Sequence, residues 1–142
     1  MKKTIILLAL FMLSSMFLSA QSSKGSIEVL FFKENIPCCG GNCPGCKARA
    51  DKYLRADIRK IIKTNYTDSS VIFKVIKMSD STNYSLIEKY KAKSQTVVIV
   101  KKKKKKDLSM DISDIIKTYV QNQNKDSLEL ELKNKIEVIK KK

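Results

Sequence analysis

The order of apolar and polar positions divides most of the chain into short strands and amphipathic helices. Runs rich in β-branched and aromatic residues predict strands at residues 26–32, 71–78 and 96–100. The third run is apolar after its first residue, so we expect it in the centre of a sheet that is covered on both faces. A turn over Lys101–Lys106 and a weak fourth strand over residues 107–110 would complete a hairpin.

Apolar residues that recur every three or four positions predict helices between and after these strands. One helix is expected from Cys46 to about Lys63, a short one after the capping side chains of residues 80–83, one with Ser113 as its cap, and one over residues 127–142. We expect their tyrosines to be buried or half-buried. The apolar positions are Tyr53, Leu54, Ile58, Ile61 and Ile62, then Tyr84, Ile87 and Tyr90, then Ile115, Ile116, Tyr119 and Val120, and finally Leu128, Leu132, Ile136 and Ile139.

The predicted elements follow the order strand, helix, strand, helix, strand, strand, helix, with one more helix at the end. Strands that alternate with helices favour parallel pairing, whereas two strands joined by a tight turn are antiparallel. The sequence therefore predicts an α/β fold around a mixed four-stranded sheet.

The first twenty residues have the pattern of a secretory signal peptide. Lys2 and Lys3 precede the apolar run Thr4–Leu18, and Ala20 supplies the small residue that signal peptidase requires. Cleavage after Ala20 would remove residues 1–20 and leave residues 21–142, a length suited to a single domain. An uncleaved membrane anchor is the alternative, but the apolar run is short for a span of about 20 residues. We expect a periplasmic or secreted protein that is not integral to the membrane after cleavage.

The chain is strongly basic, with 29 Lys and Arg residues against 14 Asp and Glu residues and a formal net charge of +15. This balance favours anionic partners, and Lys101–Lys106 is a candidate contact for an acidic partner or an anionic surface, with a solvated turn as the alternative. No nucleic acid partner is expected, because the aromatic residues do not alternate with the basic ones. Histidine is absent, so site chemistry must rest on Cys, carboxylates or Lys.

The cysteines lie together in a loop between the first strand and the first helix. Within this loop, Cys43-Pro44-Gly45-Cys46 is a CxxC motif at a strand-to-helix junction. A thiol in the first turn of a helix faces unpaired backbone N–H groups and the positive end of the helix dipole, which lower the pKa of the thiol. We therefore predict that Cys43 is the attacking thiolate and Cys46 the resolving thiol in exchange with protein thiols or disulfides.

Two other uses of the cysteines stay open. Structural disulfides would suit a small exported domain, although a CxxC bridge closes too short a loop to stabilise it much, and four cysteines allow three pairings. A soft metal or metalloid could instead bind Cys38, Cys43 and Cys46, with Cys39 poorly placed as a fourth ligand. Cys38 and Cys39 could also form a second redox pair. The sequence contains no flavin or nicotinamide fingerprint, and no cofactor is predicted.

The element order and the CxxC motif resemble the thioredoxin and glutaredoxin superfamily over nearly all of residues 21–142. More narrowly, the chain is similar to small exported proteins of the ArsF family, which are labelled a nitrophenyl compound nitroreductase subunit. The segments that carry this similarity are Cys43-x-x-Cys46, Val71–Met78, Glu88-Lys89-Tyr90, Ser94–Val100 and Asp111-Ile112-Ser113-Asp114. The resemblance implies a thioredoxin-like three-layer α/β/α sandwich with an extra C-terminal helix, and a redox role for the motif.

Two features of thioredoxins have no counterpart at the matching positions. Thioredoxins carry a cis-proline before the third strand, facing the CxxC motif, where this chain has Ser94-Gln95-Thr96. A cis peptide bond before a residue other than proline costs about 2.5 to 4 kcal/mol, so we do not expect Gln95 to reproduce that bend. Thioredoxins also carry a buried acid and a Trp before the motif, whereas residues 30–35 offer only Lys33 and Glu34 as charged groups.

Overall fold

The computed structural model describes residues 26–35 and 47–142, with side chains described from residue 50 in the second range. Its elements follow the predicted order and begin and end within about two residues of the predicted limits. The strands are β1 (Ile27–Lys33), β2 (Val71–Lys77), β3 (Val97–Lys101) and β4 (Leu108–Asp111). The helices are α2 (Lys47–Asn65), the 3-10 turn η2 (Ser81–Asn83), α3 (Tyr84–Lys89), α4 (Ser113–Asn122) and α5 (Lys125–Lys141).

The four strands form one mixed sheet in the order β2-β1-β3-β4. β1 pairs with β2 in parallel, from Ile27 opposite Val71 to Lys33 opposite Lys77. β3 is antiparallel to both β1 and β4, and Ile27 lies opposite Lys101 in the first of these pairings. The prediction of a mixed sheet with residues 96–100 in its centre is confirmed, and the fold is thioredoxin-like.

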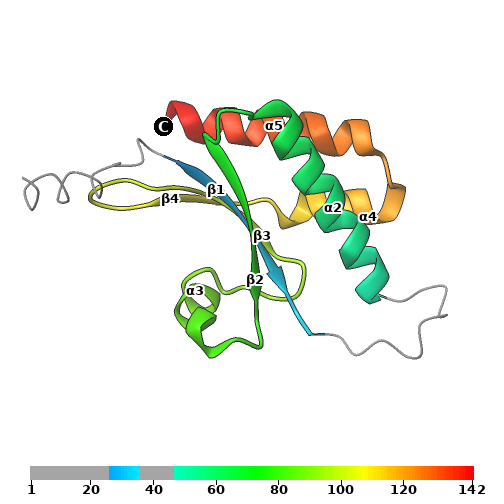
Figure 1. Cartoon of the computed structure of the whole chain (residues 1–142), viewed down its shortest axis with the longest axis horizontal. Helices are drawn as coiled ribbons and strands as arrows, with labels where there is room; N and C mark the ends of the chain where they lie inside the picture. Colours follow the sequence, from blue (N-terminus) through cyan, green and yellow to red (C-terminus); the bar gives the residue numbers. More distant parts are fainter. Residues whose placement is uncertain (1–25, 36–46) are drawn as a thin grey trace, which may run out of the picture.

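Helices cover both faces of the sheet and make a three-layer α/β/α sandwich (Figure 1). β1 sends alternate side chains to opposite faces, as the twofold repeat of a strand requires: Val29 and Phe31 join the core under α2, α4 and α5, whereas Leu30 and Phe32 join the smaller core under α3. Phe32 meets Tyr90 edge to face there, with ring centroids 6.2 Å apart. The stripe predicted on the last helix is fully buried, and it comprises Leu128, Leu132, Ile136 and Ile139.

Two predicted core tyrosines are on the surface, which corrects the expectation drawn from spacing. Tyr53 is 63% exposed and Tyr84 is 61% exposed, whereas Tyr119 is buried. Tyr53 precedes the buried Leu54, and adjacent helical positions are about 100° apart, so Tyr53 lies beside the buried stripe and not in it. Tyr84 is the first residue of a six-residue helix, too short to bury a full stripe.

Ser113 does not cap α4, contrary to the prediction. The N-cap residue is Ile112, without a side-chain cap, and Ser113 is the first helical residue. The Ser113 hydroxyl accepts a hydrogen bond from the backbone N–H of Val97 at 3.2 Å, while the backbone N–H of Ser113 donates to Asp111 Oδ1 at 2.8 Å. The serine therefore ties the start of α4 to the start of β3.

Candidate functional site

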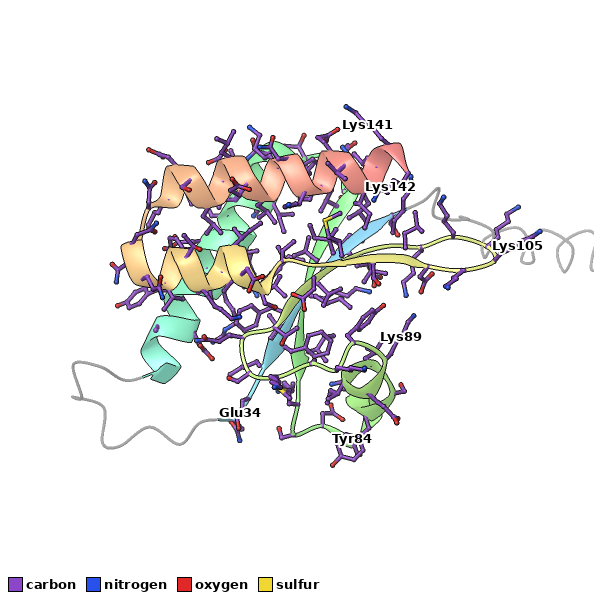
Figure 2. The ribbon with its side chains drawn as sticks, turned by 180° about the vertical axis from the view of Figure 1, so that it is seen from behind. Glu34, Tyr84, Lys89, Lys105, Lys141 and Lys142 are labelled. Carbon is purple, nitrogen blue, oxygen red and sulfur yellow. The ribbon has the colours of Figure 1, made fainter. Side chains whose placement is uncertain are left out.

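The cysteine loop joins the end of β1 to the start of α2. Cys38, Cys39, Cys43 and Cys46 all lie outside the described residues, so the predicted attacking and resolving thiols stay predictions. The described residues on either side of the loop belong to one end of the molecule, where β1 ends and α2 begins (Figure 1). Figure 2 labels Glu34 at this end, just beyond β1. Among the described residues, the end of β1 and the start of α2 flank the loop in the chain, and the turn before β3 lies beside the end of β1.

A carboxylate is buried in the second turn of α2. Asp51 is only 1% exposed, and it lies on the inward stripe that continues with Leu54 and Ile58, three and seven residues further on. Its Oδ1 accepts a hydrogen bond from Gln95 Nε2, while its Oδ2 has no hydrogen-bond partner among the described residues. Because a buried carboxylate oxygen without a partner is costly, it is uncommon in folded proteins outside functional sites.

Gln95, at the position of the thioredoxin proline, forms a bend of a different kind. The described peptide bonds are all trans, and the bend comes instead from a positive φ of 66° at Gln95. The Thr96 N–H donates to the Lys93 carbonyl at 3.0 Å, which places Gln95 third in a four-residue turn, where a type II turn requires positive φ. A residue other than glycine bears a cost of roughly 1 to 2 kcal/mol in this conformation, so surrounding contacts must hold Gln95 there.

Contacts of both the backbone and the side chain hold Gln95. The Gln95 N–H donates to the Phe32 carbonyl at 3.0 Å, and the Phe32 N–H donates to the Thr96 carbonyl at 2.9 Å. Two residues of the loop thus oppose one residue of β1, which is a β-bulge at the end of the sheet. The Gln95 side chain then reaches α2 and donates to Asp51. The bend and the buried acid are therefore one connected structure, joined by hydrogen bonds to Phe32 near the end of β1.

A second polar cluster lies further along α2. Tyr119 of α4 donates its hydroxyl to Asp57 Oδ2 at 2.5 Å, and Lys125 of α5 donates from Nζ to Asp57 Oδ1 at 3.0 Å. Burial alone would raise the pKa of Asp57, but the hydrogen bonds from Tyr119 and Lys125 outweigh it and hold that pKa below its ordinary value. Burial, followed by the bond to Asp57, raises the pKa of Tyr119 to about 12. The cluster joins three helices and keeps Tyr119 protonated at ordinary pH.

An open groove of about 260 Å³ runs between α2 and α4 beside this cluster. Exposed apolar surface lies along it, since Tyr53 is 63% exposed and Val120 is 39% exposed. The groove begins at Ala50, next in the chain to the buried Asp51. Its lining residues are Ala50, Tyr53, Leu54, Asp57, Tyr119, Val120, Gln123 and Lys125.

Sequence reasoning missed Asp51 and the cluster at Asp57. A signal for Asp51 was present, because a single acid on an otherwise apolar helical stripe is directed into the core. No sequence signal indicates the contact between Asp57 and Tyr119, which are 62 residues apart. Within residues 26–35 and 47–142 no group of three or more His, Cys, Asp or Glu residues is arranged to hold a metal ion. The proposed thiolate site lies outside these ranges.

The predicted lysine turn is confirmed as the connection between β3 and β4. It lies at the other end of the sheet from the buried acid, because Lys101 pairs with Ile27 at the start of β1. Among the residues that the structure describes, no helix has the length and apolar character needed to cross a bilayer.

The chain matches no family model and no curated protein. One solved structure, described as "Structure of a malarial protein", shares 18% sequence identity with a TM-score of 0.37, and the match covers 68% of this chain and 96% of that chain. At that score the similarity carries no weight for fold or function.

Proposed function

We propose that this protein is an exported thioredoxin-like protein that exchanges thiols and disulfides through Cys43 and Cys46, as the predicted similarity to the ArsF family also implies. The observation that carries the proposal is the pairing of Asp51 with Gln95. It supplies a buried acid with a free oxygen, and a fixed turn, at the end of the sheet to which the CxxC motif is joined in the chain. Cys46 is covalently bound to Lys47, the first residue of α2, and Asp51 follows five residues after Cys46.

The proposed exchange proceeds in two displacements. The Cys43 thiolate attacks one sulfur of a partner disulfide, so a mixed disulfide forms and the second partner sulfur leaves as a thiolate. Cys46, after losing its proton, attacks the sulfur of Cys43, which forms the Cys43–Cys46 disulfide and releases the first partner sulfur as a thiolate. The partner gains two electrons and the motif loses two. The reverse sequence oxidises a partner dithiol.

Asp51 is proposed as the acceptor for the proton that Cys46 releases. Oδ1 is engaged by Gln95, and Oδ2 is without a partner among the described residues, so one oxygen is oriented and the other is available. The carboxylate belongs to the helix that follows the motif, whereas in thioredoxins the buried acid precedes it. Such a group makes the second displacement faster at pH values where an isolated thiol is mostly protonated.

Export is proposed together with this activity. Residues 1–20 carry the pattern of a cleavable signal peptide, and an oxidising compartment is where exchange between protein disulfides has substrates. The groove beside Tyr53 and Val120 is proposed as the apolar surface for such a partner, on the helix that follows the motif in the chain.

The proposal is tested by trapping the mixed disulfide with the exported protein. A Cys46→Ser variant is expected to accumulate an adduct through Cys43, because the resolving thiol is missing. The same change is made in a background that also carries Cys38→Ser and Cys39→Ser, so that neither can resolve the adduct. If no adduct accumulates in either background, and Cys43 alkylates with the pH dependence of an ordinary thiol, thiol exchange through this motif is wrong.

A measurement of metal and thiols separates exchange from metal binding. Protein purified without oxygen is analysed for metal, and its thiols are counted before and after reduction. Thiol exchange predicts no stoichiometric metal and a pair of thiols that disappears on oxidation. Stoichiometric metal together with four reduced thiols would instead establish the soft-metal site at Cys38, Cys43 and Cys46.

A further inference from the structure

The start of β1, the hairpin between β3 and β4 and the end of α5 meet at the end of the molecule opposite the candidate site. Lys101 pairs with Ile27, and the Lys102 N–H contacts the Ser26 carbonyl at 3.5 Å. Figure 2 shows Lys105 at the tip of the hairpin, with Lys141 and Lys142 at the end of α5. We call this surface, Lys101–Lys106 with Lys140–Lys142, the lysine end.

Half of the hairpin lysines have structural partners. Lys101 Nζ donates to the main-chain oxygen of Lys140 at 2.5 Å, and Lys103 Nζ donates to that of Lys142 at 2.7 Å. Both ammonium groups thus satisfy oxygens at the C-terminal end of α5, where the helix dipole is negative. Lys102 lies between the carboxylates of Glu28 and Asp107, at 3.8 Å and 3.7 Å.

The other half of the hairpin lysines have no such partners among the described residues. Lys104, Lys105 and Lys106 are exposed and make no ion pair or side-chain hydrogen bond among the described residues. The two carboxylates that Lys102 contacts are also engaged by other lysines, Glu28 by Lys74 at 2.6 Å and Asp107 by Lys89 at 3.2 Å. Three adjacent like charges repel one another and therefore do not stabilise the fold, so a structural role does not explain their presence.

We infer that the lysine end docks on an anionic lipid bilayer, through Lys104, Lys105 and Lys106. A bilayer surface attracts each lysine by charge alone and needs no matching shape. Protein interfaces, by contrast, are depleted in lysine and take most of their energy from aromatic and arginine anchors. The tip contains no such anchor, because the residues between Lys101 and Leu108 are five lysines and Asp107. A lipid surface therefore fits this tip better than an acidic protein does.

The direction of the first strand gives this docking an orientation. The described part of the chain enters β1 at Ser26, beside Lys102. β1 is seven residues long, which places the candidate site roughly 20 Å further from the lipid.

The test is binding of the exported protein to vesicles of phosphatidylglycerol mixed with phosphatidylcholine, with vesicles of phosphatidylcholine alone as the comparison. Binding is expected to the anionic vesicles only, and to weaken as salt is added. Replacing Lys104, Lys105 and Lys106 together by Gln is expected to weaken it roughly 100-fold, at about tenfold or less per charge. The matched control replaces Lys52, Lys93 and Lys117 by Gln, which are exposed lysines away from the lysine end.

Equal losses in the two triple variants would overturn the inference, because net charge and not the hairpin would then govern binding. Absence of binding to the anionic vesicles would also overturn it. The exported protein is applied to immobilised polyglutamate in parallel; if it binds there through the hairpin lysines and not to vesicles, the partner is an acidic protein. None of these measurements involves a thiol, so their outcome is independent of the proposed exchange reaction.

Discussion

The two ends of β1 use polar residues in opposite ways. At the candidate site, a few polar groups are buried and depend on one another: Asp51 on Gln95, and Gln95 on Phe32. At the lysine end, many charges are exposed, and several of them have no partner at all among the described residues. A buried polar contact is lost completely when one partner is changed, whereas exposed charges act additively and each contributes little. We therefore expect single substitutions to matter at the first end and only combined ones at the second.

The largest effect is expected from Gln95→Pro, which installs the residue that thioredoxins have at this place. Proline fixes φ near −65°, whereas Gln95 has φ 66°, and proline lacks the N–H that Gln95 donates to Phe32. The free energy of unfolding should fall by about 3 kcal/mol or more. Urea denaturation of the variant measures this. Unchanged stability would show that the turn can take the thioredoxin conformation after all.

Tyr119→Phe is expected to have the next largest effect, because it removes the hydrogen bond to the Asp57 carboxylate. A partly buried hydrogen bond to a charged group contributes about 2 kcal/mol. The raised pKa of Tyr119 gives the loss a pH signature, since the stabilisation is complete below the unfolded-state value of about 10 and declines as the pH rises towards about 12. The wild-type protein and the variant should therefore converge in stability at high pH.

The stability difference between the wild-type protein and Tyr119→Phe, measured at acid pH, tests the role of Asp57. Its pKa is lowered in the folded protein, so its contribution is complete above the unfolded-state value of about 4 and is lost as the pH falls through the folded-state value. The difference in stability between the wild-type protein and Tyr119→Phe should narrow again at acid pH. A difference that stays constant from acid to alkaline pH would show that Tyr119 acts through packing alone.

The sequence predicts the fold more completely than the candidate site. Hydrophobic spacing is a local property, so the apolar strand at residues 96–100 and the stripe from Leu128 to Ile139 could be located from the chain alone. The turn at Gln95 could be found only as a departure from a family pattern. Its φ depends on contacts with Phe32 and Asp51, which are distant in the sequence.

The two ends also differ in what a sequence can indicate about partners. A run of lysines is visible directly, but the division into Lys101–Lys103, which are engaged, and Lys104–Lys106, which have no partner among the described residues, depends on where α5 ends and where Glu28 and Asp107 lie. Asp51 was visible as a polar residue on an apolar stripe, yet its contact with a residue 44 positions away was not. Sequence patterns thus identify residue types at a site, while tertiary contacts decide which atoms are free.

Asp51→Asn should separate stability from activity at the candidate site. The change keeps an oxygen to accept from Gln95 and replaces the buried, unpartnered carboxylate oxygen by a neutral amide nitrogen. We expect the resolving step of thiol exchange to slow, because an amide cannot accept the proton, while the free energy of unfolding changes by about 1 kcal/mol or less, because one unpartnered buried polar atom replaces another. Denaturation and the rate of disulfide release measure the two effects. A less stable variant with unchanged exchange would mean that Asp51 is purely structural.

The smallest effect on stability is expected from the combined change of Lys104, Lys105 and Lys106 to Gln. These side chains are exposed and make no internal contact among the described residues, so the free energy of unfolding should change by less than about 0.5 kcal/mol. Any change should be a small gain, because the mutual repulsion of three charges is removed.

Lys101→Met is the matched comparison, since Lys101 Nζ donates to the Lys140 oxygen and its loss leaves that helix end without this partner. Thermal unfolding at low salt measures both variants. If the triple variant is the less stable of the two, the exposed lysines hold the hairpin in place, and the contrast between a structural half and a free half of the lysine run is wrong.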